Sequence, residues 1–274
     1  MTLAGIAGPV RLPADAFELS QFGFSVESLA SGALEWKLNA ETPFGNGIPG
    51  VYSAAVRATH LSTVTFSFRS RQIEKYEFFV IELENAVIES TSTSATTSGA
   101  ESASVVLTFS FAAVQLTFVP LKPDGSRDVP VVVSWDLERG SGHGPAASSF
   151  AYALNARVPG AVQLTAFSPA APIGEDELSD ATLGLPVDAS VIEDVFYVAR
   201  RSVLPDGHVQ VFLPSHGDKG LLTGDFGFTS PMITAVNISG MFANVRFDAA
   251  GYEWTTIGYG PDGAPLPPQT SSYP

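Results

Sequence analysis

The sequence predicts a mainly β protein with two β-rich domains, and three observations support this fold class. Apolar and polar side chains alternate in runs along the whole chain, which is the pattern of half-buried strands. The 25 glycines, 20 prolines and 19 phenylalanines favour strands joined by many turns. With 274 residues, of which 45% are hydrophobic, the chain has enough apolar material for a large core.

The strands of the first half are recognised by apolar residues at every second position. Residues 64–69 alternate in this way. In the next run, Phe79, Ile81, Leu83 and Val87 are predicted to share one face. Both runs are therefore predicted to be half-buried strands.

In two places the apolar parity shifts by one residue. One shift lies between Leu19 and Phe22, and the other lies near Ala112-Ala113. A bulge or sharp bend at each place would keep the apolar faces directed inward. Bent strands of this kind are what the closure of a barrel or sandwich requires, so we predict a curved sheet.

Two segments of the first half depart from the strand pattern. Residues 51–60 follow Pro49-Gly50 and carry a short apolar stripe, which predicts one short helix. Residues 91–104 are almost entirely Ser, Thr, Ala and Gly. That composition predicts a solvent-exposed hairpin loop.

The composition changes after Trp135-Asp136-Leu137-Glu138. Residues 139–149 are mostly Gly, Ser and Ala and hold almost nothing that could pack in a core. We therefore predict one β-barrel domain over residues 1–138, a linker over residues 139–149 and a β-rich carboxy-terminal domain over residues 150–274.

The second domain repeats the β pattern with one ambiguous segment. Residues 208–213 and 241–247 are its clearest strands, whereas residues 188–199 suit a helix capped by Asp188 and a strand equally well. Pro-Asp-Gly occurs at 123–125, 205–207 and 261–263, and its first and last copies follow long alternating runs. This spacing hints at an internal duplication.

Charge and composition exclude several classes of function. The formal net charge is −14, so a nucleic-acid backbone is an unsuitable partner. The chain contains no cysteine, which removes thiolate metal sites and cysteine nucleophiles. Because no apolar run of about 18 residues occurs, and the amino terminus lacks the features of a secretory leader, we expect no membrane insertion and no cleaved signal peptide.

Chemistry-bearing residues are few. The histidines are His60, His143, His208 and His216, and no His-x-x-x-His or His-Glu pair supports a metal site. Residues 215–218, Ser-His-Gly-Asp, contain the side chains of a hydrolytic triad. Residues adjacent in sequence do not normally form a triad, so a turn is favoured there.

The acidic and glycine-rich stretches are also interpreted as structural segments rather than as binding sites. Residues 175–177 with Asp180 lack the regular spacing of a calcium loop, and a solvated loop is favoured. Residues 224–227 and 258–263 have no lysine for phosphate binding, and the sequon at Asn237 carries no further inference. We therefore predict no catalytic, cofactor-binding or metal-binding residues, no cofactor, and a protein that is not an enzyme.

Five features between residues 76 and 136 occur in an order that resembles one family. They are a strand over residues 76–88 with Asn85 before an apolar pair, a Ser/Thr/Gly-rich loop, Glu101-Ser102 opening a long strand, the Pro-Asp-Gly turn at 123–125, and a closing Trp135-Asp136. This order resembles the Hcp family, the tube subunits of the bacterial type VI secretion system. Residues 3–8 and 17–26 resemble the family's first strands more loosely, because Gly23-Phe24 replaces the usual Trp region. The resemblance covers residues 1–138, and the additional carboxy-terminal domain is the main departure.

The resemblance implies a fold and a function. The fold is a β-barrel with one packed helix, which assembles into hexameric rings that stack into a tube. Such tubes are fired by a contractile sheath, carry a spike protein at the tip and hold effector proteins in the lumen. The expected subunit resides in the bacterial cytoplasm before assembly and is then secreted.

Two other hypotheses remain for the whole chain. Residues 1–138 are a delivery module fused to a carboxy-terminal effector or cargo domain, or the chain is a β-rich surface-binding or phage-tail-like protein. For the tube hypothesis, the carboxy-terminal domain is a second, diverged barrel or an external decoration. If the duplication is real, a ring contains three two-barrel chains rather than six chains, and the sequence leaves both stoichiometries open.

Overall fold

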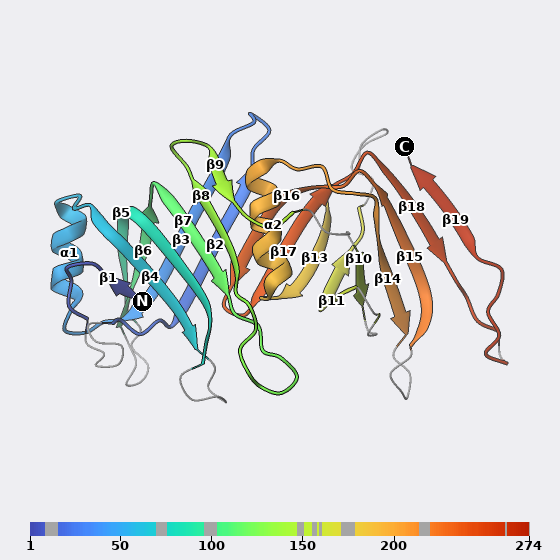
Figure 1. Ribbon diagram of the computed structural model, residues 1–274, viewed down its shortest axis with the longest axis horizontal. Helices are drawn as coiled ribbons and strands as arrows, with labels where there is room; N and C mark the ends of the chain where they lie inside the picture. Colours follow the sequence, from blue (N-terminus) through green and yellow to red (C-terminus); the bar gives the residue numbers. More distant parts are fainter. Residues whose placement is uncertain are drawn as a thin grey trace. The chain divides into compact units, whose positions relative to one another are not determined.

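The computed structural model consists mainly of strands and turns, with two helices in the part of the chain that it describes (Figure 1). The described residues are 1–8, 16–69, 76–95, 103–146, 151–154, 158, 161–170, 179–213, 220–260 and 262–273. The chain divides into two compact units, Met1–Pro145 with Asn237–Gly240, and Ala146–Val236 with Met241–Pro274. The predicted mainly β fold with a second β-rich domain is confirmed.

The first unit contains one helix and a set of strands that pair in antiparallel fashion. Its elements are β1 (Thr2–Leu3), β2 (Gln21–Ser28), β3 (Leu34–Pro43), α1 (Ile48–Val56), β4 (Leu61–Arg69), β5 (Glu77–Ala95), β6 (Ala103–Ser110), β7 (Ala113–Phe118), β8 (Val131–Asp136) and β9 (Ser141–His143).

Strand β5 belongs to two layers of this unit. Its first half pairs with β4 on one edge and with β7 on the other, and β7 continues to β8 and β9. Its second half, from Val87 to Ala95, pairs with β6, which continues to β3 and β2. Asn85 lies between the halves with a positive φ of 49°, so the backbone turns there and the strand passes from one layer to the other.

The turn at Asn85 corrects one prediction about which residues share a face. Phe79, Ile81 and Leu83 are buried as predicted, but Val87 is only half-buried. Beyond Asn85 the buried positions are Ala86 and Ile88. The positive φ reverses the parity of the side chains, which strict alternation did not anticipate.

Phenylalanine rings from different strands fill the core of the first unit. Phe66 of β4 is fully buried, and its ring centroid lies 5.4 Å from that of Phe22 and 5.7 Å from that of Phe109. Phe24 and Val26 of β2 are also buried, so the predicted inward face of this strand is confirmed. Tilted and edge-to-face aromatic contacts of this kind add to the stabilisation that apolar burial supplies.

The predicted short helix is present as α1 and begins three residues earlier than predicted. Pro49 occupies its first turn, where a missing N–H costs nothing. Ile48, Val51 and Ala54 form its buried face, and the helix contacts β5. Ala58 follows the helix with a positive φ of 48°, and Thr59 N–H donates to Ala54 C=O at 2.9 Å, which is a Schellman-type end.

Two predicted irregular segments contain more strand than expected. Residues 91–95 and 103–104, predicted as loop, continue β5 and begin β6, because Ser and Thr side chains are tolerated on an exposed strand face. The rest of that loop lies outside the described residues. Within the predicted linker 139–149, β9 pairs with β8 through a tight turn at Gly140, whose φ is 59°.

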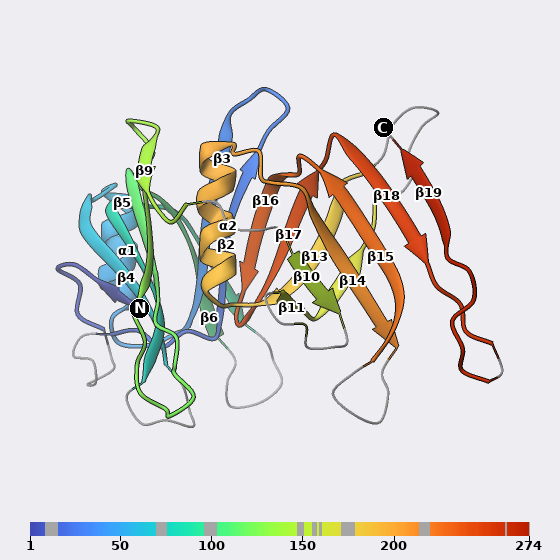
Figure 2. The ribbon, with the colours of Figure 1, turned by 45° about the vertical axis from the view of Figure 1, so that its right-hand side comes forward.

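The second unit has a similar inventory of elements. They are β10 (Ala151–Leu154), β11 (Val162–Leu164), β12 (Ala166–Ser168), β13 (Ala181–Pro186), α2 (Ala189–Arg200), β14 (Gly207–Leu213), β15 (Leu221–Thr229), β16 (Met232–Ser239), β17 (Phe242–Asp248), β18 (Gly251–Thr256) and β19 (Gln269–Tyr273). Figure 2 shows β14, β15, β18 and β19 as successive neighbours.

The ambiguous segment 188–199 is the helix α2. Asp188 is its N-cap, and its Oδ1 atom accepts hydrogen bonds from the backbone N–H groups of Ser190 at 2.9 Å and Val191 at 3.4 Å. A carboxylate in this position satisfies donors that have no partner within the helix. The cap therefore decides in favour of the helix although the segment is rich in β-branched and aromatic residues.

The strand pairing of the second unit repeats that of the first. The layer β2-β3-β6-β5 corresponds to β12-β13-β17-β16, and the layer β4-β5-β7-β8 corresponds to β14-β15-β18-β19. In both units the helix lies in sequence between the equivalents of β3 and β4. The single strand β5 is represented by two strands, β15 and β16, separated at Ser230-Pro231.

Irregular backbone features repeat at the same places. Asn85 with a φ of 49° corresponds to Ser230, whose φ is also 49°. The residue before each, Glu84 or Thr229, accepts a backbone hydrogen bond from the following turn, where Ala112 N–H donates at 3.1 Å and Ala250 N–H donates at 2.9 Å. The second helix also ends like the first: Arg201 has a φ of 52°, and Ser202 N–H donates to Tyr197 C=O at 3.0 Å.

The outer two Pro-Asp-Gly segments also correspond to each other. Gly125 and Gly263 have positive φ values of 82° and 77°. Asp124 Oδ1 accepts from Ser126 N–H at 2.9 Å, and Asp262 Oδ1 accepts from Ala264 N–H at 3.1 Å. The two turns connect equivalent strands, β7 to β8 and β18 to β19. The strand connectivity therefore supports the internal duplication that these turns suggested.

The two units differ at their edges. β1 pairs antiparallel with β4, whereas β10 runs parallel to β14 and to β11. β9 has no equivalent after β19 in the described part of the second unit. The divergence is therefore concentrated outside the repeated layers.

The left-handed residue after α1 gives a test of the helix end. Ala58→Gly should increase the free energy of unfolding by about 1 kcal/mol, because glycine adopts positive φ without the steric cost that a Cβ atom incurs. Ala55→Gly, within the same helix, should decrease it by about 0.5–1 kcal/mol. Urea unfolding of the two variants and the parent protein measures both changes. Destabilisation by both substitutions would contradict the assigned helix end.

Candidate functional site

The described histidines take up separate positions. The Nδ1 atom of His60 lies 2.9 Å from Asn85 Oδ1, His143 is exposed on β9, and His208 is half-buried on β14. His216 lies outside the described residues. No group of three or more His, Asp or Glu side chains in the described ranges is arranged to hold a metal ion.

The other sequence candidates have local structural roles where they are described. Asp180 accepts a hydrogen bond from Thr234 Oγ1 at 2.6 Å, so it links two segments of the second unit. Residues 224–227 lie within β15, and the sequon at Asn237 lies within β16. Residues 175–177 and 215–218 lie outside the described residues.

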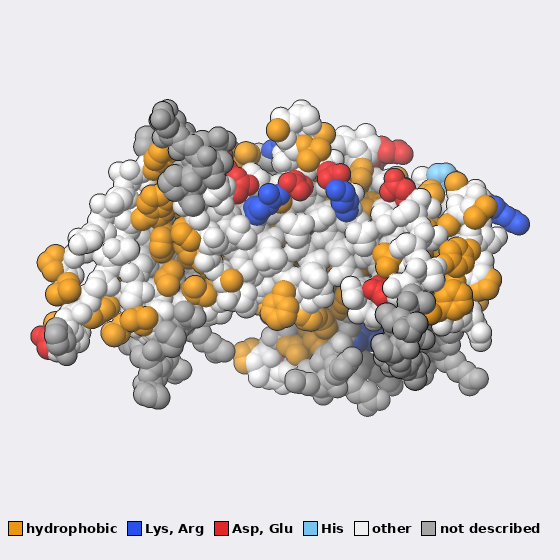
Figure 3. All heavy atoms as spheres, turned by 180° about the vertical axis from the view of Figure 1, so that it is seen from behind, with side chains coloured by type: hydrophobic (Ala, Val, Ile, Leu, Met, Phe, Trp, Pro, Cys, Tyr) orange, Lys and Arg blue, Asp and Glu red, His pale blue; other side chains and the backbone are white. Residues whose placement is uncertain are grey.

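Basic side chains are few and lie close to acidic ones. On the face drawn in Figure 3, two basic side chains lie beside acidic ones near the upper middle, and the basic side chains do not form a broad patch there. The ion pairs Lys37–Glu35, Arg69–Glu77 and Arg139–Asp136 have N–O distances of 2.8, 3.3 and 3.4 Å. Such exposed pairs contribute little to stability. Neither described helix is long and apolar enough to cross a membrane.

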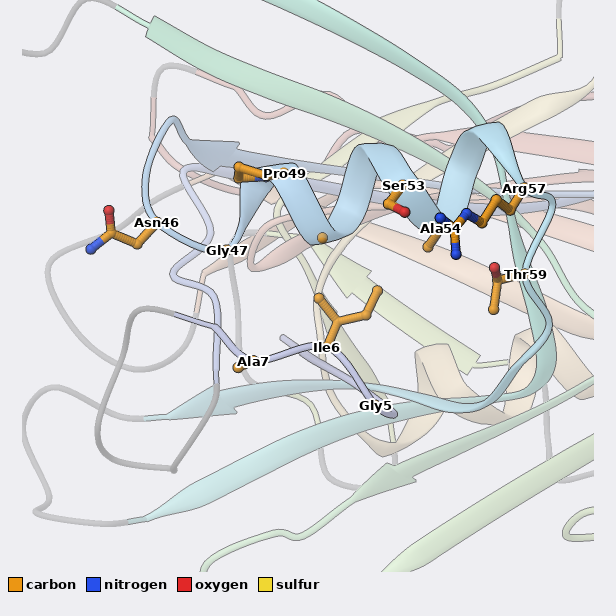
Figure 4. Close-up of a pocket in the computed structure, with 11 residues that line it drawn as sticks. Gly5, Ile6, Ala7, Asn46, Gly47, Pro49, Ser53, Ala54, Arg57 and Thr59 are labelled. Atoms are coloured by element: carbon orange, nitrogen blue, oxygen red, sulfur yellow. The ribbon is translucent and has the colours of Figure 1, made fainter.

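A cavity of about 490 Å³ lies between the amino-terminal segment and α1 (Figure 4). Its lining is mostly small or apolar, and Arg57 is its one charged residue among those described. Asn46 and Arg57 are drawn at its two ends in Figure 4. Acid–base chemistry needs titratable groups within reach of one another, and the described lining offers no such pair.

The most perturbed titratable group lies in the second unit. Asp194 of α2 is 3% exposed, and its Oδ2 atom has no hydrogen-bond partner in the described structure. Burial raises the pKa of Asp194 well above its ordinary value of 3.8, and the negative charges of Asp188 and Glu193 raise it further.

The pKa of Tyr152 on β10 is also raised by burial and by nearby acidic side chains. Burial raises the pKa of Tyr152 well above 10.0, and the charge of Asp194 is the next cause. Val191, Ile192 and Val195 on the same helix are fully buried. Tyr152 and Asp194 are both buried, so this pair belongs to the core of the second unit.

Several strands have only one strand neighbour among the described residues: β9, β11 and β19, and also β12 and the second half of β5. The second half of β5 pairs only with β6, and β12 pairs only with β13. Unpaired N–H and C=O groups along a strand edge can accept another strand. For a chain without a chemical centre among its described residues, these edges are the strongest candidate for a functional surface.

Residues 15–118 match the family described as "Type VI secretion system effector, Hcp". The amino-terminal unit is Hcp-like. This match confirms the resemblance predicted from the order of motifs between residues 76 and 136. It does not extend to the carboxy-terminal unit, and none of the curated proteins matches the chain in sequence.

The solved structures that resemble this chain cover about half of it. A type six secretion system protein is 16% identical, covers 52% of this chain and 96% of its own, and gives a TM-score of 0.47. Hcp1 from Salmonella typhimurium is 12% identical, with 52% and 95% covered and a TM-score of 0.44. A type VI secretion system effector from Yersinia pestis is 12% identical, with 49% and 96% covered and a TM-score of 0.42. Because these TM-scores lie below 0.5, we infer nothing further from them.

Sequence reasoning missed both the buried carboxyl and the open edges. A signal for Asp194 was present, since this acidic residue interrupts the apolar residues Val191, Ile192 and Val195. No comparable signal marks β12, which is three residues long. Its edge becomes visible only when the strand pairing is known.

The buried carboxyl predicts how stability depends on pH. The pKa of Asp194 is higher in the folded chain than in the unfolded chain. Its contribution to the free energy of unfolding is therefore fully present below pH 3.8, the ordinary pKa. This contribution is lost as the pH rises, because the unfolded chain ionises at a lower pH than the folded chain. Asp194→Asn removes this loss. The stability of the variant relative to the parent should therefore increase as the pH is raised from below 3.8, as measured by urea unfolding across a pH series.

Ile192→Val, on the same helix, is the matched control: it removes one buried methyl group and no ionisable group, so its stability difference from the parent should be the same at every pH. A stability difference between Asp194→Asn and the parent that does not change with pH would show that the carboxyl ionises alike in the folded and unfolded chains.

Proposed function

We propose that the protein is a ring-forming structural subunit of the tube in a type VI secretion system or a related contractile injection apparatus. The match of residues 15–118 to the Hcp family is the observation that carries this proposal. The role is assembly and delivery rather than catalysis. Fold alone does not specify a function, but here a sequence-level family match accompanies the fold.

The second unit acts as a further tube domain in this proposal. Its layers repeat the strand pairing of the first unit, including the turns at Gly125 and Gly263 and the positive-φ residues Asn85 and Ser230. A fused effector or cargo domain has no reason to share these features. The repeated connectivity therefore favours two barrel-like units in one tube subunit over a delivery module with unrelated cargo.

A two-unit chain changes the proposed number of subunits in a ring. The Hcp resemblance implies six single-barrel positions around each ring. If each chain fills two positions, three chains complete the ring with pseudo-sixfold symmetry. Assemblies of identical chains with closed symmetry are also the usual form of protein oligomers.

The remaining parts of the proposal concern partners and location. The rings stack within a contractile sheath, carry a spike protein at the tip and hold effector proteins in the lumen. The subunit assembles in the bacterial cytoplasm and is then secreted. The absence of cysteine is compatible with both compartments, since no disulfide has to form or persist.

Electron microscopy and native mass determination of the purified full-length chain test the proposal together. We expect rings or stacked tubes, with a ring mass of three times 28.8 kDa. Rings of six chains would support the structural role and reject the three-chain closure. A protein that remains monomeric at high concentration, with no rings in the images, would reject the structural role itself.

A further inference from the structure

We propose that Asn46, in the turn before α1, is a site of spontaneous deamidation through a cyclic imide formed with the backbone of Gly47. This modification does not depend on the proposed ring-forming role, because it requires only the local fold of the first unit and water. Asn46 is the one asparagine in the sequence that is followed by glycine. Glycine has no Cβ atom, so its backbone nitrogen can be approached closely by the preceding side chain.

The reaction balances with water as its co-reactant. The backbone nitrogen of Gly47 gives up its proton and attacks the side-chain Cγ atom of Asn46, and the new C–N bond closes a ring. The bond from Cγ to the side-chain nitrogen breaks, and this nitrogen leaves with the proton as ammonia. Water then opens the imide. Cleavage of the new C–N bond gives aspartate, and cleavage of the original peptide C–N bond gives isoaspartate.

The fold requires glycine at position 47. A Cβ atom added there would lie 2.6 Å from Cε1 of Phe17 and 2.7 Å from the backbone oxygen of Ala7, and Phe17 is buried. Both distances are shorter than the normal separation of non-bonded atoms. Another residue at this position would therefore displace its neighbours. The packing of the first unit keeps an unshielded backbone amide directly after Asn46.

The reacting groups are accessible to solvent and to each other. Asn46 is exposed, and Figure 4 shows its side chain pointing away from α1. Within the described part of the chain, neither the carboxamide of Asn46 nor the N–H group of Gly47 has a hydrogen-bond partner. The Gly47 amide can therefore lose its proton to solvent hydroxide without first breaking a hydrogen bond.

A single backbone hydrogen bond spans the turn in the described structure. The N–H group of Ile48 donates to the carbonyl of Gly45 at 3.1 Å. Gly47 has a φ of −92° and a ψ of −19°, which is the geometry of the third residue of a type I turn. Asn46 lies between two glycines, which have more backbone freedom than other residues. The rotation that brings Cγ to the Gly47 nitrogen therefore has little local structure to disrupt.

The other described asparagines lack this combination of features. All four are exposed, so exposure alone does not distinguish Asn46. Three lie within β3, β16 and β17, and the fourth is the positive-φ residue of β5. Each is followed by alanine, isoleucine or valine, whose Cβ atom hinders the approach to the backbone nitrogen. These four residues are Asn39, Asn85, Asn237 and Asn244.

The three Asp-Gly pairs provide a second comparison, because aspartate can form the same imide by loss of water. In each pair the aspartate Oδ1 atom accepts a hydrogen bond from a backbone N–H group, at 2.9 Å for Asp124, 2.8 Å for Asp206 and 3.1 Å for Asp262. These bonds hold the carboxylate in place. The Asn46 side chain has no such restraint in the described structure.

The two products should affect α1 differently. This helix has no acidic residue in its first turn and no side-chain cap, so a carboxylate at position 46 would lie near the positive end of the helix dipole. Isoaspartate carries the same charge but lengthens the main chain by one methylene group before the closely packed Gly47. We therefore expect aspartate to be tolerated and isoaspartate to destabilise the first unit.

Deamidation also changes the cavity beside α1. Asn46 and Arg57 both line it, and Arg57 is the one charged residue of the described lining. Either product adds a negative charge, so the cavity would then contain charges of both signs.

Peptide mass spectrometry of the folded full-length chain tests the proposal. The protein is incubated at mildly alkaline pH, samples are digested over time, and the conversion of each asparagine is measured. We expect Asn46 to react at least about tenfold faster than Asn39, Asn85, Asn237 and Asn244, which corresponds to about 1.4 kcal/mol in activation free energy. Both aspartate and isoaspartate should appear, since direct hydrolysis of the side chain would give aspartate alone.

Two variants and one condition serve as controls. Asn46→Gln keeps the carboxamide and should remain unmodified at this position, because its longer side chain closes a ring less readily. Asn46→Asp is the reference for the aspartate product and should unfold in urea at the same concentration as the parent or a higher one. The chain unfolded in urea gives the reactivity of Asn46 without the turn.

Three results would overturn the proposal. Modification of Asn46 in urea but not in the folded chain would show that the turn protects this residue. Conversion no faster than that of Asn39 would remove the special role of Gly47. Aspartate without isoaspartate would exclude the attack by the Gly47 nitrogen.

Discussion

The fold of each unit depends on one constraint: a long strand has to leave one layer and enter another without losing its backbone hydrogen bonds. In the first unit this happens at Asn85, where positive φ turns β5 while its two halves stay paired to different neighbours. Asparagine tolerates this conformation better than most residues do. β4 and β7 pair with the first half of β5 and β6 pairs with the second half, and the remaining strands extend the layers from these three.

In the second unit the change of layer occurs at a different local sequence. Ser230 adopts the positive φ, and Pro231 follows it at the break between β15 and β16. Proline cannot donate to a strand ladder, so the continuous strand of the first unit becomes two strands here. The neighbours of each half are nevertheless retained, which is why connectivity shows the relationship more clearly than sequence does.

Much of the fold could be predicted from the sequence because strands with one buried face repeat every second residue. The alternation in β4 and β17 and the stripe of α1 were sufficient to place these elements. Side-chain parity beyond Asn85 could not be predicted, since a single left-handed residue reverses it and most residue types give no signal of doing so. The helix α2 required its cap at Asp188, because β-branched and aromatic residues fit both structures. The expectation that the chain has no catalytic centre follows from its amino-acid composition. The open strand edges could not be predicted in this way, because they depend on which distant segments pair.

Asn85 and Ser230, the positive-φ residues at which the strands change layer, also contact the segment that follows the helix of their repeat. His60 lies 2.9 Å from the Asn85 side chain across 25 residues, and Asp206 accepts from Ser230 N–H at 2.8 Å across 24 residues. The entropy lost on closing a loop grows only with the logarithm of its length, so the two loops have nearly the same closure cost. Each corner is therefore closed by contacts within its own repeat, and neither repeat supplies a residue to the other's corner contact.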